Sequence, residues 1–260
     1  MSKTNTEKKN QSNKNYTKWL CIGLIAAVVV IGIIWAVNRS DNENKSSSKV
    51  PDELANILPD ECKDVQEAEF TLDKNLKVVA VGSYSGDYME DGSDEAVSDV
   101  MMIVVANEGE DTLQYAEITL TGDTDEGDAD GAVFKLSTLK PGDRVMVLEA
   151  NRKAYSSNDS YTEASIANVV FFTEPLSLYE DKLEIQPLEG GFNITNISDE
   201  DITGDIVVYF KSKAEDMYQG GITYRGRIEG GLNAGEIRQV MSEHFYGSET
   251  KVMFITIAEE

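Results

Sequence analysis

The stretch VSDVMMIVVANEGEDTLQYAEITL, residues 97–120, decides the fold class of this chain. It holds two apolar runs rich in β-branched side chains, separated by a polar segment of Asn, Glu, Gly and Asp that favours a turn. The second run alternates, so Ala116, Ile118 and Leu120 share one face of an extended chain and polar side chains take the other. This pattern is typical of strands that bury one face, and it predicts an antiparallel β-sheet.

The same rhythm continues along the chain from residue 65 onward. Short apolar runs bounded by Gly, Asn and Asp recur, and no stretch after residue 60 keeps a helical period. The further strands expected before Pro175 are Leu76–Tyr84, Ala132–Leu136, Arg144–Ala150 and Ile166–Phe172. Those expected after it are Lys182–Pro187, Gly191–Asn196, Ile202–Phe210, Ile222–Glu229, Glu236–Phe245 and Lys251–Ala258. The sequence therefore predicts an all-β protein with one sandwich over residues 65–175 and a second over residues 176–260.

Two short motifs occur in both halves at similar spacing. Val105–Gly109 (VANEG) parallels Ile194–Ser198 (ITNIS), and Leu139–Asp143 (LKPGD) parallels Leu232–Glu236 (LNAGE). The distance from the Asn of the first motif to the Gly of the second is 35 residues in the first half and 39 in the second. In such a turn Pro fixes φ at one corner, and Gly supplies a positive φ at the next. The matching offsets predict a tandem repeat, in which Ile206, Val208 and Phe210 take the core positions of the second copy.

This order of elements resembles a known family. A strand that ends in Asn, an acid-flanked strand of alternating apolar pattern, and Leu-x-Pro-Gly-Asp before the next strand are similar to the FxLYD-type immunoglobulin-like domains of Gram-positive surface proteins. Where the name-giving motif of that family falls, the chain has ITLTG (residues 118–122) and VVYFK (residues 207–211). The resemblance implies two tandem immunoglobulin-like β-sandwiches on a bacterial surface, and it implies no catalytic residues.

A second stretch predicts a membrane anchor. Leu20–Val37, LCIGLIAAVVVIGIIWAV, is apolar throughout and, as a helix, covers most of a hydrocarbon core of about 30 Å. Trp19 and Trp35 lie near its ends, where aromatic side chains anchor helices at the membrane interface. We therefore expect one transmembrane helix over residues 19–37. A cleaved signal peptide is the alternative, but this run exceeds the apolar region of about 7–15 residues that such a peptide carries.

The charges around this run predict its orientation. Residues 1–18 carry five lysines and one glutamate, whereas basic and acidic residues are mixed after the helix. The positive-inside rule places the tail 1–18 in the cytoplasm and the C-terminal part outside the cell membrane. Residues 38–64 begin with a Ser- and Asn-rich run and are expected to form a flexible stalk.

The chain is strongly acidic, with 23 Lys and Arg against 47 Asp and Glu and a formal net charge of −24. Such a surface repels phosphate groups, so nucleic acid is not expected as a partner. The expected partners are the lipid bilayer around the helix and a cell-surface protein or wall polymer, and no cofactor is expected. Cys62 is the one cysteine outside the anchor, so no intramolecular disulfide is expected there.

The acidic segment DTDEGDADG, residues 123–131, is a candidate for calcium binding. The carboxylates of Asp123, Asp125, Asp128 and Asp130 offer the oxygen ligands that this ion takes in proteins. The bidentate Glu that a helix–loop–helix site places at its twelfth position is missing. A hairpin loop is the plainer interpretation, and no metal site is expected.

Two other features raise the question of chemistry. Lys77 and Asn168 fall on the first and last expected strands of the first half, the arrangement in which some surface sandwiches form an isopeptide cross-link. His244 is the only histidine of the chain, and no nucleophile elbow accompanies it. No catalytic residues are expected. The leading hypothesis is a membrane-anchored binding or spacer protein, the second is an accessory or regulatory subunit of a membrane complex, and the third is a hydrolase.

Overall fold

The structure is a computed structural model that describes residues 53–258, apart from 125–126 and 129–130. Its regular elements are β-strands and two short 3-10 turns, η2 (Asp73–Asn75) and η3 (Gly247–Glu249), so the predicted all-β fold is confirmed. No helix within this part of the chain is long and apolar enough to cross a membrane. The expected tail 1–18 and the expected span 19–37, with Trp19 and Trp35, lie outside the described residues.

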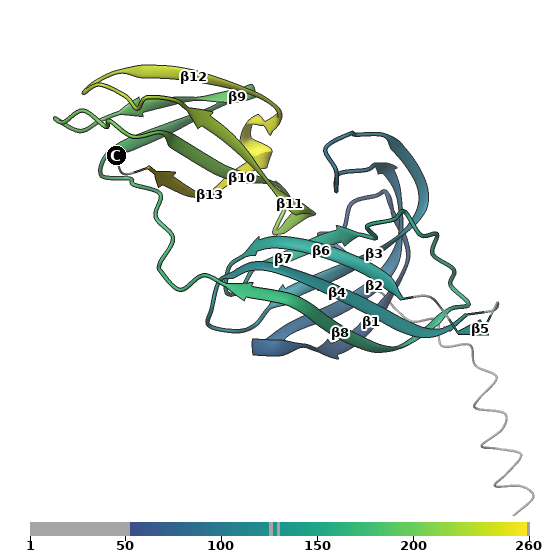
Figure 1. The fold of residues 1–260 in the computed structure, drawn as a ribbon. Helices are drawn as coiled ribbons and strands as arrows, with labels where there is room; N and C mark the ends of the chain where they lie inside the picture. Colours follow the sequence, from purple (N-terminus) through teal and green to yellow (C-terminus); the bar gives the residue numbers. More distant parts are fainter. Residues whose placement is uncertain (1–52, 125–126, 129–130, 259–260) are drawn as a thin grey trace, which may run out of the picture. The chain divides into compact units, whose positions relative to one another are not determined.

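The largest sheet has seven strands drawn from both halves of the sequence. Figure 1 labels these strands on the ribbon. In order across the sheet they are β1 (Cys62–Thr71), β2 (Leu76–Asp87), β3 (Ala96–Asn107), β7 (Arg144–Leu148), β11 (Met217–Ile228), β10 (Ile206–Ala214) and β13 (Thr250–Ile257). Neighbours are antiparallel except β7 and β11, which run parallel and pair only through Val145 with Tyr218 and Met146 with Gln219. This short pairing joins first-half strands to second-half strands within one compact unit.

Two smaller sheets complete the fold. β4 (Leu113–Thr124) lies between β6 (Ala132–Leu139) and β8 (Ser160–Phe171), and β5 (Gly127–Asp128) pairs with the end of β4. β9 (Leu183–Asn196) pairs with β12 (Ile237–Tyr246) in a two-stranded sheet. Each strand expected from the sequence is present with shifted ends, and β9 joins the two runs expected at 182–187 and 191–196.

Folded structure begins before residue 65, within the segment expected to be a stalk. β1 starts at Cys62, and Leu54 is 1% exposed. Leu54, Ile57 and Leu58 pack in one cluster, and the amides of Ile57 and Leu58 each donate to the carbonyl of Leu54 at 3.0 Å. A stalk can therefore extend only through residues that precede this turn. The sequence pattern does not predict β1, because this strand carries many charged side chains and few apolar ones.

The two halves pair their strands in the same way. In the first half β3 pairs with β7, and β4 pairs with β6 and β8; in the second β9 pairs with β12, and β10 pairs with β11 and β13. In each half the two groups of strands meet across a buried core, which is consistent with a β-sandwich. The first half adds the hairpin β1–β2 beside β3, whereas no described strand takes the matching place beside β9.

A buried asparagine ends the first strand of this arrangement in both halves. Asn107 of β3 and Asn196 of β9 are 1% and 0% exposed. Each side-chain amide donates to two main-chain carbonyls: those of Asp111 and Leu139 for Asn107 (2.9 Å each), and those of Glu200 (2.8 Å) and Leu232 (3.1 Å) for Asn196. The side-chain oxygens accept from the amides of Gly109 and Ser198, both at 3.0 Å.

The turn glycines complete the match. The amides of Gly142 and Gly235 donate to the carbonyls of Asn107 (2.8 Å) and Asn196 (2.9 Å). Their φ values of +81° and +74° lie in the left-handed region, where glycine is unstrained. The paired motifs of the sequence thus correspond to the same set of hydrogen bonds in both halves.

The core faces predicted from strand alternation are confirmed. Ala116, Ile118 and Leu120 of β4 are fully buried. They belong to the core in which residues of β4, β6 and β8 pack with residues of β2, β3 and β7. The matching residues of β10 in the second half, Ile206, Val208 and Phe210, are fully buried as well. A second cluster of buried side chains contains Leu54 together with residues of β2, β3 and β7 that do not belong to the first core.

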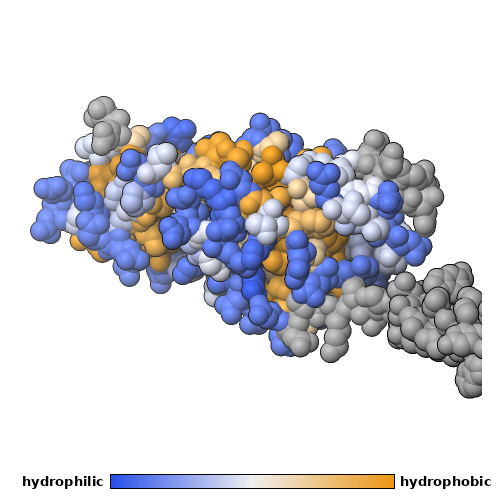
Figure 2. Space-filling view, turned by 90° about the horizontal axis from the view of Figure 1, so that it is seen from below, coloured by the Kyte–Doolittle hydropathy of each residue, from blue (hydrophilic) through white to orange (hydrophobic). Residues whose placement is uncertain are grey.

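The surface combines hydrophilic areas with exposed hydrophobic side chains. Figure 2 shows hydrophilic residues over much of one face, with hydrophobic residues in patches between them. The large hydrophobic side chains that the described residues expose are Val170, Ile197, Ile237, Met241 and Tyr246. All but Val170 lie on or beside the β9–β12 sheet.

Candidate functional site

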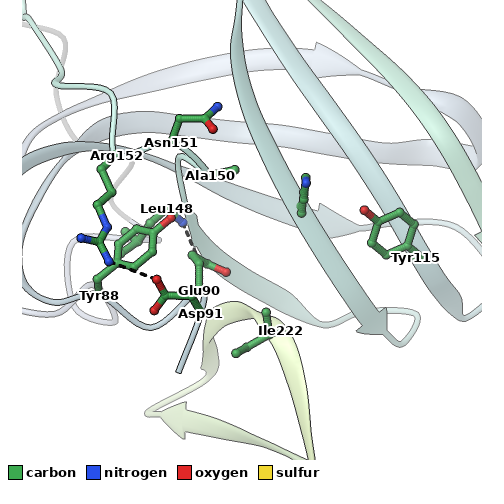
Figure 3. A pocket seen from close by; sticks show the side chains of 10 residues that line it. Tyr88, Glu90, Asp91, Tyr115, Leu148, Ala150, Asn151, Arg152 and Ile222 are labelled. Carbon is green, nitrogen blue, oxygen red and sulfur yellow. Dashed lines mark hydrogen bonds and ion pairs between the residues drawn. The ribbon is translucent and has the colours of Figure 1, made fainter. Parts of the chain in front are cut away.

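An open cleft of about 410 Å³ lies where residues of the two halves meet (Figure 3). Its walls come from the loop between β2 and β3, from β4, β6 and β7, from the segment after β7, and from β11. The lining residues are Tyr88, Glu90, Asp91, Tyr115, Lys135, Leu148, Ala150, Asn151, Arg152 and Ile222. Aromatic, acidic, basic and amide groups converge there, as they do in many ligand-binding clefts.

The loop between β2 and β3 forms one wall of the cleft. Tyr88 is buried in this loop, and the guanidinium of Arg152 lies 4.5 Å from the centre of its ring. Arg152 also pairs with Asp91 at 3.0 Å and with Glu95 at 2.6 Å. Hydrogen bonds from the hydroxyl and the amide of Ser93, together with Arg152, hold the pKa of Asp91 below its ordinary value. This carboxylate therefore stays ionised at neutral pH.

Glu90 reaches from the same loop to strands of both halves. Its Oε1 accepts a hydrogen bond from the amide of Leu148 in β7 (2.8 Å), and its Oε2 accepts one from the amide of Gly221 in β11 (2.7 Å). Lys211 of β10 is fully buried, and its Nζ donates to the carbonyls of Ser137 and Gly221 at 3.0 Å each. One glutamate and one lysine thus tie the first half to the second, and we call this group the Glu90–Lys211 tie.

Burial shifts the pKa values of both groups in this tie. Loss of hydration raises the pKa of Glu90 well above its ordinary value and lowers the pKa of Lys211 well below its own. The amide bonds from Leu148 and Gly221, and the charge of Lys211, act on Glu90 in the opposite direction. Because the carboxyl of Glu90 also lines the cleft, the cleft contains an acid whose protonation depends on its buried partner.

Glu149 holds the segment that follows β7. It is 1% exposed, and its carboxylate accepts hydrogen bonds from the amides of Val133 (3.1 Å), Asn151 (2.7 Å) and Lys153 (2.8 Å). Bonds to a carboxylate are stronger than bonds between neutral groups. They fix the position of Asn151 and of its neighbour Arg152, both of which line the cleft.

The opposite wall carries Tyr115 and Lys135. Figure 3 shows Tyr115 across the cleft from Tyr88 and Arg152. Burial, and then the hydrogen bond that its hydroxyl donates to Glu117 (2.7 Å), raise the pKa of Tyr115 to about 12, so the phenol stays neutral. Lys135 is exposed on β6. A tyrosine ring and an ammonium group are suited to stacking on, and hydrogen bonding with, a polar ligand.

The acidic segment weighed as a calcium candidate is the end of a hairpin. Asp123 of β4 and Asp128 of β5 are cross-strand partners, and Asp123 is exposed. Asp125 and Asp130 lie outside the described residues. Within the described ranges, no group of three or more His, Cys, Asp or Glu side chains is placed to hold a metal ion.

The two residues weighed for an isopeptide cross-link have different partners. Lys77 of β2 forms an ion pair with Glu108, and Asn168 of β8 donates to Glu117 at 2.8 Å. β2 and β8 belong to different sheets, and Asn168 is exposed. No hydrogen bond or ion pair within the described part of the chain joins Lys77 to Asn168.

His244 of β12 packs against the loop between β2 and β3. Its ring stacks on Tyr224 with 4.2 Å between ring centroids, and its Nδ1 lies 3.7 Å from a carboxylate oxygen of Asp94. That nitrogen is buried and has no hydrogen-bond partner among the described residues. A Ser–His type hydrolase site needs a hydroxyl or thiol hydrogen-bonded to its histidine, and Nδ1 of His244 makes no such bond to the described residues.

The residues that line the cleft cannot be predicted from the sequence pattern. Glu90 lies 58 residues from Leu148 and 131 from Gly221 in the sequence, so nothing local indicates that its carboxylate is buried between them. The one local signal is Tyr88 with two acids, Glu90 and Asp91, shortly after it in a turn-forming loop, a pattern that many solvated loops share. Comparison of the chain with protein-family models, with curated proteins and with solved structures finds no match.

Proposed function

We propose that the chain is a single-pass membrane-anchored protein whose β part lies outside the cell membrane and acts by binding or spacing rather than by catalysis. Residues 1–18 form the cytoplasmic tail of this proposal, and residues 19–37 form its transmembrane helix. The uncharged run Leu20–Val37 and the lysines before it support this topology. The repeated strand pairing and asparagine turns support two tandem immunoglobulin-like sandwiches that resemble the FxLYD type of Gram-positive surface proteins.

The observation that carries the proposal is the Glu90–Lys211 tie. A buried polar group is costly unless its hydrogen bonds are made, and here both carboxylate oxygens and the ammonium group are bonded to main-chain groups. If the halves separated, Glu90 would lose its bond from the amide of Gly221, and Lys211 would lose its bond to the carbonyl of Ser137. The tie therefore restricts the motion of one half relative to the other. Restricted motion suits a spacer, or a binding surface that is held rigid.

The cleft is the binding surface of this proposal. Charged groups at its rim, such as Arg152 and Asp91, already pair with one another and give the wall a fixed shape. Tyr115 and Lys135 on the facing wall supply a ring and an ammonium group toward solvent. These groups suit a polar polymer segment, such as a peptide or glycan of the wall, which binds through stacking and hydrogen bonds.

Capture from the producing cells tests the proposal. We expect the full-length chain, tagged at its C-terminus, to retain wall polymer or a surface protein, and Lys135→Glu to lower the retained amount about tenfold. Lys63→Glu, the same charge reversal at an exposed position of β1 outside the cleft, is the matched control. Equal retention by both variants would exclude the cleft as the binding site. Retention of one membrane protein in fixed ratio would instead identify an accessory subunit.

A further inference from the structure

Exposed apolar side chains are concentrated on the sheet formed by β9 and β12. Ile237 and Met241 of β12 are 65% and 68% exposed, the highest values among the large hydrophobic side chains of the described residues. Ile197, which follows β9, is 50% exposed, and Tyr246 at the end of β12 is 37% exposed. Single exposed apolar residues are ordinary, but a group of them on one sheet indicates an interaction surface.

The outward face of this sheet is also uncharged along its centre. In the β9–β12 register Ile237 lies opposite Thr195, Gln239 opposite Asn193, and Met241 opposite Gly191. These six positions form a strip without carboxylates in a chain whose formal net charge is −24. We call them the neutral strip. Two copies of an acidic chain repel each other over most of their surface, and this strip allows close approach.

One edge of β12 is unpaired. Within the described part of the chain β12 pairs only with β9, whereas its counterpart β7 pairs with β3 on one side and with β11 on the other. The main-chain groups along an open edge are available to another strand, and proteins usually protect such edges with charge, proline or a covering loop. Ile237, Gln239 and Met241 provide no such protection.

We propose that β12 pairs antiparallel with β12 of a second copy of this chain, with Gln239 on the twofold axis. In this register Ile237 lies opposite Met241 of the second copy, and Met241 lies opposite Ile237 of the second copy. Directly opposed side chains on one face of an antiparallel pair are in contact, so four exposed apolar side chains cover one another. The spacing 237, 239, 241 is symmetric about its centre, which is the self-complementarity that a twofold interface requires. Display on a membrane raises the local concentration and favours such pairing.

Cysteine cross-linking tests this register on the full-length chain. Cys21→Ala and Cys62→Ala remove the native thiols, and Gln239→Cys then places one thiol of each copy at the axis. Under mild oxidation in membranes we expect Gln239→Cys to form a covalent dimer at least tenfold faster than Val170→Cys, an exposed β8 control. A mixture of Ile237→Cys and Met241→Cys chains with different tags should form the mixed dimer, and neither variant alone should dimerise at that rate.

The alternatives are outcomes of the same experiment. Equal rates for Gln239→Cys and Val170→Cys, or a failure of the mixed pair to cross-link, would overturn the proposal. A second readout is the mass of the full-length chain in detergent, where Met241→Lys should weaken dimerisation at least tenfold and Val170→Lys should leave it unchanged. Dimerisation unaffected by Met241→Lys would assign self-association to another part of the chain and would also contradict the proposal.

Discussion

At the scale of single residues, the buried asparagines Asn107 and Asn196, the half-buried Glu90 and the buried Lys211 each bond several main-chain groups. Asn107 and Asn196 each satisfy main-chain groups that a turn leaves without a strand partner. Glu90 and Lys211 do the same for amides and carbonyls where the halves meet. In each case one polar side chain replaces water for several buried groups, so its loss leaves more than one group unsatisfied.

Asn107→Ala and Asn196→Ala should therefore each lower the free energy of unfolding by about 1–3 kcal/mol. The expected loss arises because the carbonyls of Leu139 and Leu232, respectively, lose their side-chain donors. Urea unfolding followed by circular dichroism measures the change. Asn56→Ala, at an exposed position, is the control and should alter stability little. A loss no larger than that of the control would show that these turns do not depend on asparagine.

Lys211→Met should make stability strongly dependent on pH. The variant removes the positive charge that lowers the pKa of Glu90, so the pKa of this acid in the folded chain rises further above its unfolded value of about 4.5. Between those two values the folded chain binds more protons than the unfolded chain, so stability falls as pH rises. We expect the variant to be less stable at pH 8 than at pH 5 by about 1–3 kcal/mol.

Urea midpoints at the two pH values check this expectation. The double variant Glu90→Gln, Lys211→Met removes both ionisable groups and should lose most of the added pH dependence. If the single and double variants showed the same slope with pH, Glu90 would not be the group that titrates.

At the scale of elements, the strands and their buried faces follow from the sequence, and the contacts between the halves do not. The period-2 pattern of β4 and β10 predicts which side chains are buried, because alternation along a strand is a local property. The sequence predicts that folded structure starts at residue 65, whereas β1 already starts at Cys62. The difference arises because β1 is an edge strand with many charged and few buried side chains. The pairing of β7 with β11 and the burial of Glu90 depend on residues far apart in the chain, for which the sequence holds no local pattern.

Gly221 in β11 tests the contact between these elements. A Cβ at this position would lie 1.9 Å from the carbonyl oxygen of Lys135, and the amide of Gly221 donates to Glu90. Gly221→Ala should loosen the junction by about 1–3 kcal/mol, which corresponds to roughly 5- to 150-fold faster hydrogen exchange at the amide of Leu148.

Gly122→Ala is the matched control, because its Cβ would lie 2.0 Å from the carbonyl oxygen of Ser160 within the first half. It should speed exchange in β4 and β8 and leave the amide of Leu148 less affected. If the amide of Leu148 exchanged at the same rate in Gly221→Ala as in the unmodified chain, the hydrogen bonds of Glu90 would not be what joins the halves.

At the scale of the whole molecule, the chain combines an N-terminal apolar run with an acidic all-β part. The acid excess after residue 37 fits the proposed location outside the membrane, where it would favour solubility, and we expect it to disfavour nucleic acid as a partner. The repeated pairing of strands gives two similar halves, and the Glu90–Lys211 tie joins them through hydrogen bonds. Binding or spacing from an anchored position is the function that we propose for this arrangement.

Protease treatment of intact cells that carry the full-length chain, tagged at both ends, tests this account most directly. We expect the protease to remove the C-terminal tag from the cell surface and to leave the N-terminal tag protected, on a chain that still contains residues 1–37. A protected C-terminal tag on intact cells, or a mature chain that lacks the first forty or so residues, would contradict it.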